Sequence, residues 1–420
     1  IMKKVLVITY YWPPSGGPAV QRVMKFCKYL PKYGWEPIVL TVRNGEYPAI
    51  DSSLLEEVKS IHVEKSKEIS FLRLFRKITG KKQIPIHQLS PQNDESFFSK
   101  IARWIRFNIF IPDGRIGWYF NAVKKGKRLI DENNIDLIFS SSPPQTVQLI
   151  AKKIAKNTKI PWVADFRDPW TDRFYYEESK RSWLTKSVDS ILEKSVLNKA
   201  NGLTTVSDSV SQLMSKHMSN KNQFYTIMNG FDESDFNGVI HKTKLDCLTI
   251  SFVGNMSKSQ NPIEFLSLID TLSQRDEKKI VVNFVGHIHP DVWDEIESRG
   301  LSHFITRKPY VPHFEAIQFM VQSDYLLLLI PNLPKNEGIV TGKLFEYVRS
   351  GSTIIMLGPI QSDAAKIISQ SQSGFVFEYN NLKGLESIFL EKKMRKEMDT
   401  SNYSREKMTQ KLSEIFDEYI

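Results

Sequence analysis

The chain has 420 residues, of which 41% are hydrophobic and 25% charged, as is ordinary for a globular protein. This length is too great for one hydrophobic core, so two domains are expected, and no apolar run approaches the roughly 18 residues that a membrane-spanning helix needs. The formal net charge of +10 indicates an anionic partner, and nucleic acid, anionic lipid and a phosphorylated substrate all qualify.

The two cysteines, Cys27 and Cys247, are far apart and lie in apolar surroundings, which favours a reduced chain. Nothing at the N-terminus resembles a signal peptide, because Lys3 and Lys4 lead straight into an apolar strand. A cytoplasmic location is therefore expected.

The first predicted elements are a buried parallel strand over 5–10, a breaker-rich loop over 11–18 and a helix from about Ala19. Another strand follows, and the order is Rossmann-like, but the G-x-G-x-x-G fingerprint of dinucleotide sites is absent. Taken alone, Gly16 and Gly17 in the loop indicate a tight turn.

Residues 43–135 have the least regular pattern, and within them 97–128 is rich in basic and aromatic residues. One helical face carries Phe97, Ile101, Trp104 and Ile105. Two interpretations stay open: an ordinary packed helix with a solvated face, or an interfacial helix on an anionic membrane surface. Because no recognised nucleic-acid module appears, nucleic acid is not an expected partner.

Regular alternation of strands and helices resumes after residue 135. A strand over 160–164 places Asp165, Arg167 and Asp168 at its carboxyl end, where open α/β sheets bind ligands. Two acids and an arginine there could orient a hydroxyl or take its proton. A helix-capping aspartate with a local Arg–Asp pair explains them equally well.

The region from Phe231 to Leu245 lacks an apolar period and is the predicted hinge. A strand over 248–253 then leads into a loop that contains Gly254, Asn255 and Lys258. The pair His287 and His289 has no third ligand at a usual spacing, so no metal site is predicted.

The most informative stretch is 336–351, where a polar loop after a solid strand enters a short helix that ends at Gly351. The free amides at its start, on Thr341, Gly342 and Lys343, would attract a phosphate. Glu346 lies one turn further on, within reach of a ribose, and Glu337 in the loop is free to meet a sugar. The pattern predicts a nucleotide-sugar site; a strand–loop–helix unit that binds nothing is the alternative.

The run from Glu337 through Thr341-Gly-Lys-Leu-Phe-Glu-Tyr347 resembles the donor-site signature of the group-1, family-4-like retaining glycosyltransferases, although its two glutamates stand one position further apart than usual. Asp-Phe-Arg-Asp-Pro-Trp at 165–170 is similar to a variant in bacterial surface-polysaccharide transferases. The resemblance implies an α/β protein of the GT-B fold, with two Rossmann-like domains whose parallel sheets face each other across a cleft. It places an acceptor domain at 1–235, with a helix over 400–420 packing back on it, and a donor domain at 245–398.

The resemblance also suggests roles for single residues. Gly16 and Gly17 would approach the donor phosphates. The loop at Gly254 would grip the diphosphate, with Asn255 where the family has an arginine and Lys258 as its nearby cation. Arg167 replaces a histidine of the family, so that histidine's role does not transfer. The implied catalytic set is Asp165, Arg167, Asp168 and Glu337, and the implied donor-binding set is Gly16, Gly17, Gly254, Asn255, Lys258, Thr341, Gly342, Lys343 and Glu346.

The function that follows is transfer of a sugar from a nucleotide-diphosphate donor to a hydroxyl, on a sugar or lipid-linked acceptor or a polysaccharide precursor. The family retains anomeric configuration and uses neither metal nor cofactor. Two alternatives stay open: a nucleotide-sugar epimerase on the same fold, and a non-catalytic, membrane-associated partner in polysaccharide assembly. A peripheral position on the inner face of the cell membrane is compatible with all three.

Overall fold

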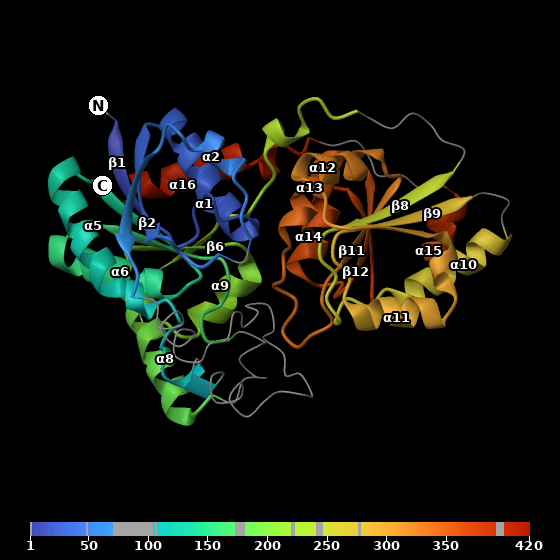
Figure 1. Ribbon diagram of the computed structural model, residues 1–420, viewed down its shortest axis with the longest axis horizontal. Coiled ribbons are helices and arrows are strands. Elements are labelled where there is room, and N and C mark those ends of the chain that lie inside the picture. Colours follow the sequence, from blue (N-terminus) through green and yellow to red (C-terminus); the bar gives the residue numbers. More distant parts are fainter. Residues whose placement is uncertain are drawn as a thin grey trace. The chain divides into compact units, whose positions relative to one another are not determined.

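The computed structural model describes residues 2–47, 49–69, 104–105, 107–172, 181–219, 223–240, 247–275, 279–391 and 399–420. They form two compact units: unit 1 comprises Ile1–Met228 with Arg405–Ile420, and unit 2 comprises Asn229–Ser404 (Figure 1). Each unit is a parallel sheet with helices on its faces, so the predicted pair of Rossmann-like α/β domains is confirmed. No helix in the described ranges is long and apolar enough to cross a membrane.

The sheet of unit 1 has seven strands in the order β3-β2-β1-β4-β5-β6-β7. The strands are β1 (Lys3–Ile8), β2 (Trp35–Arg43), β3 (His62–Lys67), β4 (Leu137–Ser142), β5 (Trp162–Phe166), β6 (Gly202–Thr205) and β7 (Phe224–Thr226). The helices are α1 (Pro18–Tyr29), α2 (Leu54–Glu57), α5 (Tyr119–Asn133), α6 (Thr146–Thr158), α8 (Trp183–Leu197), α9 (Asp208–Ser215) and α16 (Arg405–Asp417).

Strand β1 shows why this sheet is covered on both faces. Its side chains alternate, so Leu6 and Ile8 enter one apolar cluster while Val5 and Val7 enter the other. Helices α5 and α6 pack on the first face, and α1 and the C-terminal α16 pack on the second. A strand that is apolar on both sides therefore lies in the middle of a three-layer unit.

Unit 2 has a six-stranded parallel sheet in the order β10-β9-β8-β11-β12-β13. The strands are β8 (Leu248–Val253), β9 (Ile280–Val285), β10 (Ile305–Lys308), β11 (Tyr325–Leu329), β12 (Thr353–Leu357) and β13 (Gly374–Phe377). The helices are α10 (Ile263–Arg275), α11 (Pro290–Ser298), α12 (His313–Gln322), α13 (Gly342–Ser350), α14 (Asp363–Gln370) and α15 (Leu385–Leu390). Short 3-10 turns occupy Leu30–Tyr33, Ile116–Trp118, Glu233–Phe236, Leu301–Phe304 and Ser401–Tyr403.

Helix α13 forms where the sequence predicts it. Leu344, Phe345 and Val348 are fully buried, as their spacing indicates. Gly351 follows the helix in the left-handed conformation, with φ of 86°, which a glycine adopts without strain. The predicted buried stripe and glycine stop are both confirmed.

Two expectations change. Strand β5 runs to Phe166, so Asp165 lies within the sheet, opposite Ser141 and Thr204 of its neighbours, rather than just beyond it. Most of the helical face predicted near Trp104 lies outside the described residues, and Trp104 itself is 52% exposed. The described part therefore does not show a buried face there.

Candidate functional site

The start of α13 is open to an external partner. Its N-cap, Thr341, makes no side-chain capping hydrogen bond. The first amides of any helix lack partners within the helix, so those of Gly342 and Lys343 are available to an acceptor. A Cβ built on Gly342 would meet no other described atom within 4 Å, so there is free space before the helix. The predicted anion site is therefore not blocked by side chains.

Lys343 places a buried amine beside this helix start. Its Nζ lies 3.7 Å from the centroid of the Phe252 ring and has no hydrogen-bond partner among the described residues. Burial lowers the pKa of Lys343 to about 7, against the opposing effect of the nearby Glu346 carboxylate. Parts of the side chain reach the surface, but the amine itself does not.

The loop after β8 meets the same amine. Gly254 has φ of 121°, and a Cβ on it would stand 3.4 Å from Lys343 Nζ. The structure thus brings together Gly254 and Lys343, which are far apart in sequence and which the sequence assigned separately to donor binding. Thr341 Oγ1 is also buried without a hydrogen-bond partner in the described chain. Burying a polar atom without a partner is costly, so the two atoms at this one helix start are suited to an external acceptor.

Glu346 is held by a residue that the sequence did not single out for this site. Its Oε1 lies 3.0 Å from Nε2 of His313, the first residue of α12. The Glu346 side chain is only 14% exposed. A single sequence holds no signal for this pair, because the two residues are 33 positions apart on different helices.

The remaining donor-site predictions in unit 2 lie at the surface. Glu337 and Asn255 are exposed. The carbonyl of Glu337 accepts from the amide of Asp363 at 2.9 Å. Lys258 is exposed and forms a 2.7 Å ion pair with Asp291, whose hydrogen bond and charge raise the pKa of the lysine.

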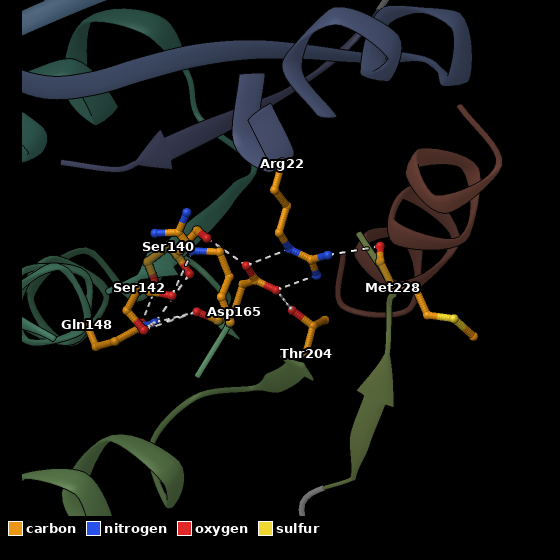
Figure 2. A network of polar contacts seen from close by, with 9 residues as sticks. Arg22, Ser140, Ser142, Gln148, Asp165, Thr204 and Met228 are labelled. Atoms are coloured by element: carbon orange, nitrogen blue, oxygen red, sulfur yellow. Dashed lines mark hydrogen bonds and ion pairs between the residues drawn. The ribbon is translucent and has the colours of Figure 1, made fainter. Parts of the chain in front are cut away.

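In unit 1, Asp165 is at the centre of a buried polar network (Figure 2). Its Oδ1 accepts from Arg22 Nη2 and Thr204 Oγ1, both at 2.8 Å. Its Oδ2 accepts from Arg22 Nε at 3.1 Å and Ser141 Oγ at 2.6 Å. Burial alone would raise the pKa of this carboxyl, but Arg22 and the two hydroxyls hold it below its usual range. Because each carboxylate oxygen accepts two hydrogen bonds, the contacts of this carboxylate are typical of a structural group.

Arg22 extends this network to the end of the unit, since its Nη1 donates to the carbonyl of Met228 at 3.0 Å. One guanidinium thereby joins helix α1 to strands β4, β5 and β6 and to the chain that leaves β7 (Figure 2). Arg22 was not singled out from the sequence, because its partner Asp165 is 143 positions away.

Arg167 and Asp168, the other predicted catalytic residues of unit 1, have different surroundings from Asp165. Arg167 donates from Nε to the Ser142 carbonyl at 3.0 Å and from Nη2 to the Pro143 carbonyl at 2.6 Å. Asp168 is exposed beyond the end of β5. Asp168 therefore has the most accessible carboxylate of the predicted catalytic residues in unit 1.

The glycine loop before α1 has a structural explanation. Gly17, the N-cap of α1, has φ of 90°, a conformation that side chains disfavour. The amide of Gly16 donates to the Ala49 carbonyl at 2.9 Å, and a Cβ there would come within 3.1 Å of Asp51. These contacts account for both glycines as a tight turn; ligand contact remains a prediction.

Among the described residues, no group of three histidine, cysteine or acidic side chains could hold a metal ion.

The fold resembles solved structures over nearly the whole chain. Anabaena HepE in complex with UDP superposes with a TM-score of 0.62 at 14% identity, covering 99% of this chain and 100% of that one. The lipopolysaccharide outer core galactosyltransferase WaaB in its apo form gives 0.59 at 12%, covering 99% and 100%. Sucrose-phosphate synthase from Thermosynechococcus elongatus gives 0.59 at 11%, covering 98% and 94%. No curated protein matches significantly in sequence.

These likenesses confirm the predicted fold class, GT-B, with its two Rossmann-like domains. The model of Glycosyltransferase Family 4 matches residues 16–235, more than half of the chain. The chain belongs to glycosyltransferase family 4, so the predicted glycosyltransferase class is confirmed. Stereochemistry, substrates and site residues remain predictions.

The buried network gives a stability prediction. Asp165→Ala should lower the free energy of unfolding of unit 1 by roughly 3–5 kcal/mol, because it leaves the buried Arg22 charge unpaired. Asp168→Ala is the matched control: the same change three positions on, at an exposed residue, should stay within about 0.5 kcal/mol. Urea denaturation followed by circular dichroism measures both, and equal effects would contradict the structural role of Asp165.

Proposed function

We propose that the protein transfers a sugar from a nucleoside-diphosphate donor to a hydroxyl acceptor, and that the donor diphosphate binds at the start of α13. The observation that carries the proposal is the buried Lys343 amine without a hydrogen-bond partner, next to an uncapped helix start. A diphosphate supplies the negative charge and the acceptor oxygens that this amine, the Thr341 hydroxyl and the helix amides lack. The UDP complex of HepE supports a uridine nucleotide as the donor.

Transfer leaves negative charge on the departing diphosphate. Lys343 and the amides of Gly342 and Lys343 stabilise that charge, and they act strongly because the amine lies in a low-dielectric environment against Phe252. Glu346, held in place by His313, accepts hydrogen bonds from the ribose hydroxyls. Fixing the carboxylate beforehand reduces the entropy that donor binding costs.

Other roles follow from the family resemblance. The anomeric configuration is retained, no metal takes part, and a donor phosphate oxygen takes the proton of the acceptor hydroxyl. Asp168 orients the acceptor at the end of β5, and Arg167, anchored on two carbonyls, keeps that strand end in place. Asp165 acts only through Arg22, as a positioning residue for α1 and its glycine loop. Glu337 faces the sugar of the donor, Gly254 gives the diphosphate room, and Asn255 and Lys258 act at the rim.

A polysaccharide or lipid-linked precursor is the acceptor class that we favour, since the WaaB neighbour acts on the lipopolysaccharide outer core. With a panel of UDP-sugars alone, the protein should release UDP only slowly and return every donor sugar unchanged. A bacterial lipid extract that offers hydroxyl acceptors should speed UDP release and collect the radiolabelled sugar. Mass spectrometry identifies the donor sugars and the released UDP, and thin-layer chromatography detects the radiolabelled sugar on the lipid. An epimerised donor formed without acceptor would instead establish the epimerase alternative.

Donor binding should depend on pH through Lys343. Above pH 7 its amine is increasingly neutral in the free protein and must take up a proton when the diphosphate binds, so UDP affinity should fall as the pH rises from 7.5 to 9. UDP itself titrates at its terminal phosphate near the lower end of this range and at the uracil N3 towards the upper end. The Lys343→Met variant binds the same UDP and therefore serves as the reference for these contributions.

Calorimetric titrations of UDP, in two buffers of different ionisation enthalpy, measure the affinity and the proton uptake together. Lys343→Met should remove both the pH slope and the proton uptake, whereas the exposed Lys383→Met should leave them unchanged. A wild-type affinity that is flat or rises over this range would contradict the proposed role of Lys343.

A further inference from the structure

Helix α8 of unit 1 buries its acids and exposes part of its apolar surface. Its two acids, Asp189 and Glu193, are buried, at 0% and 1% exposure. Three of its large apolar side chains point outward, with Trp183, Leu184 and Ile191 exposed by 78%, 58% and 66%. Leu192, Val196 and Leu197 face the core of the unit. On a surface helix the acids normally face the solvent and the large apolar side chains face the core, so the buried acids and the exposed apolar side chains are both unusual. The outward face of α8 is therefore apolar and carries none of the helix's negative charge.

Specific contacts hold the acids inward. Asp189 accepts from the indole Nε1 of Trp170 at 2.7 Å and forms a 2.8 Å ion pair with Arg181. Glu193 accepts from Thr171 Oγ1 at 2.6 Å. Rotating the helix to bury its apolar residues would break these contacts and expose both acids. The apolar face is thus a fixed feature of the unit.

Positive charge accompanies the apolar residues. Lys186 and Lys194 are exposed on α8. On the adjoining α6, burial and the positive charges of Lys156 and Lys199 lower the pKa of Lys152, which shows that lysines gather there. Such clustering is unfavourable in isolation and becomes favourable next to an anionic surface.

A second segment of the described chain, around Asn108, lies beside the start of α8 (Figure 1). The side chain of Asn108 accepts from the amide of Ser182, the N-cap of α8, at 2.7 Å, and the carbonyl of Asn108 accepts from Thr185 Oγ1 at 3.3 Å. These bonds fix Asn108 against the helix start. That segment carries Trp104 and Ile109, which are 52% and 58% exposed.

We propose that the outward face of α8, together with the exposed side chains of Trp104 and Ile109, docks on a phospholipid bilayer with anionic head groups. Tryptophan and aliphatic side chains enter the boundary between head groups and acyl chains, while the lysines meet lipid phosphates. Charge complementarity favours this occupant: the helix face is basic and without exposed acids, and the whole chain carries a net charge of +10. The inference does not rest on the donor assignment, since a bilayer could bind unit 1 whatever unit 2 binds.

Co-sedimentation of the full chain with vesicles tests the proposal. Phosphatidylglycerol–phosphatidylcholine vesicles should bind the protein, and pure phosphatidylcholine vesicles should bind it far less. Lys186→Glu with Lys194→Glu should weaken binding roughly 30-fold or more, because each basic residue near an anionic surface contributes about fivefold. Trp183→Ser with Leu184→Ser and Ile191→Ser should abolish binding that persists at high salt.

Matched controls carry the same changes elsewhere. Lys383→Glu with Lys411→Glu alters the net charge equally, and Leu390→Ser removes another exposed leucine; both should bind vesicles like the wild type. All variants should unfold at the melting temperature of the wild type and bind UDP with unchanged affinity, which separates this test from that of the donor site. Equal vesicle binding by the α8 and control variants would overturn the proposal. So would concentration-dependent dimerisation that the α8 variants abolish without any vesicle binding, because the face would then cover a second copy of the chain.

Discussion

An amine buried without a hydrogen-bond partner is the feature on which the donor site depends. Lys343 Nζ lies against Phe252 and beside Gly254, where water is excluded and no described acceptor replaces it. Burial has lowered its pKa to about 7, so the unfolded chain holds the proton more tightly than the folded one between that value and the ordinary pKa near 10.4. The folded state accordingly gains stability as the pH rises through this window. A protein keeps an amine that lowers the stability of its folded state in this way where a bound ligand offsets the loss.

The two units place charge in their interiors in opposite ways. In unit 1, Asp165 is fully buried but meets Arg22 and two hydroxyls, so both of its carboxylate oxygens are satisfied and the network stabilises the junction of helix and strands. In unit 2, Lys343 and Thr341 leave polar atoms bare at an uncapped helix. The satisfied charge of Asp165 indicates a structural role, whereas the unsatisfied amine of Lys343 at a helix start favours a role in binding. The residue types alone do not distinguish the Asp165 network from the Lys343 site, because both contain residues that are expected in catalysis.

Sequence patterns predicted what depends on local order. Apolar runs marked the strands, and the spacing of Leu344, Phe345 and Val348 with Gly351 marked α13. Pairings between distant residues could not be predicted from the sequence. Arg22 contacts Asp165, and His313 contacts Glu346, only after the chain has folded. Helix α8 illustrates the same limit. The burial of Asp189 and Glu193 depends on hydrogen bonds from Trp170 and Thr171, which lie in another segment of the chain.

The thermal stability and UDP affinity of one variant, Lys343→Met, together test the donor site most directly. Methionine has a similar length and needs no hydrogen bond, so at pH 7 the variant should melt higher than the wild type, by roughly 2–4 °C for each kcal/mol recovered. It should also bind UDP at least about tenfold more weakly, because a charge-assisted contact to phosphate is lost. A variant that melts lower and binds UDP with unchanged affinity would show that Lys343 is a structural residue and that the diphosphate binds elsewhere.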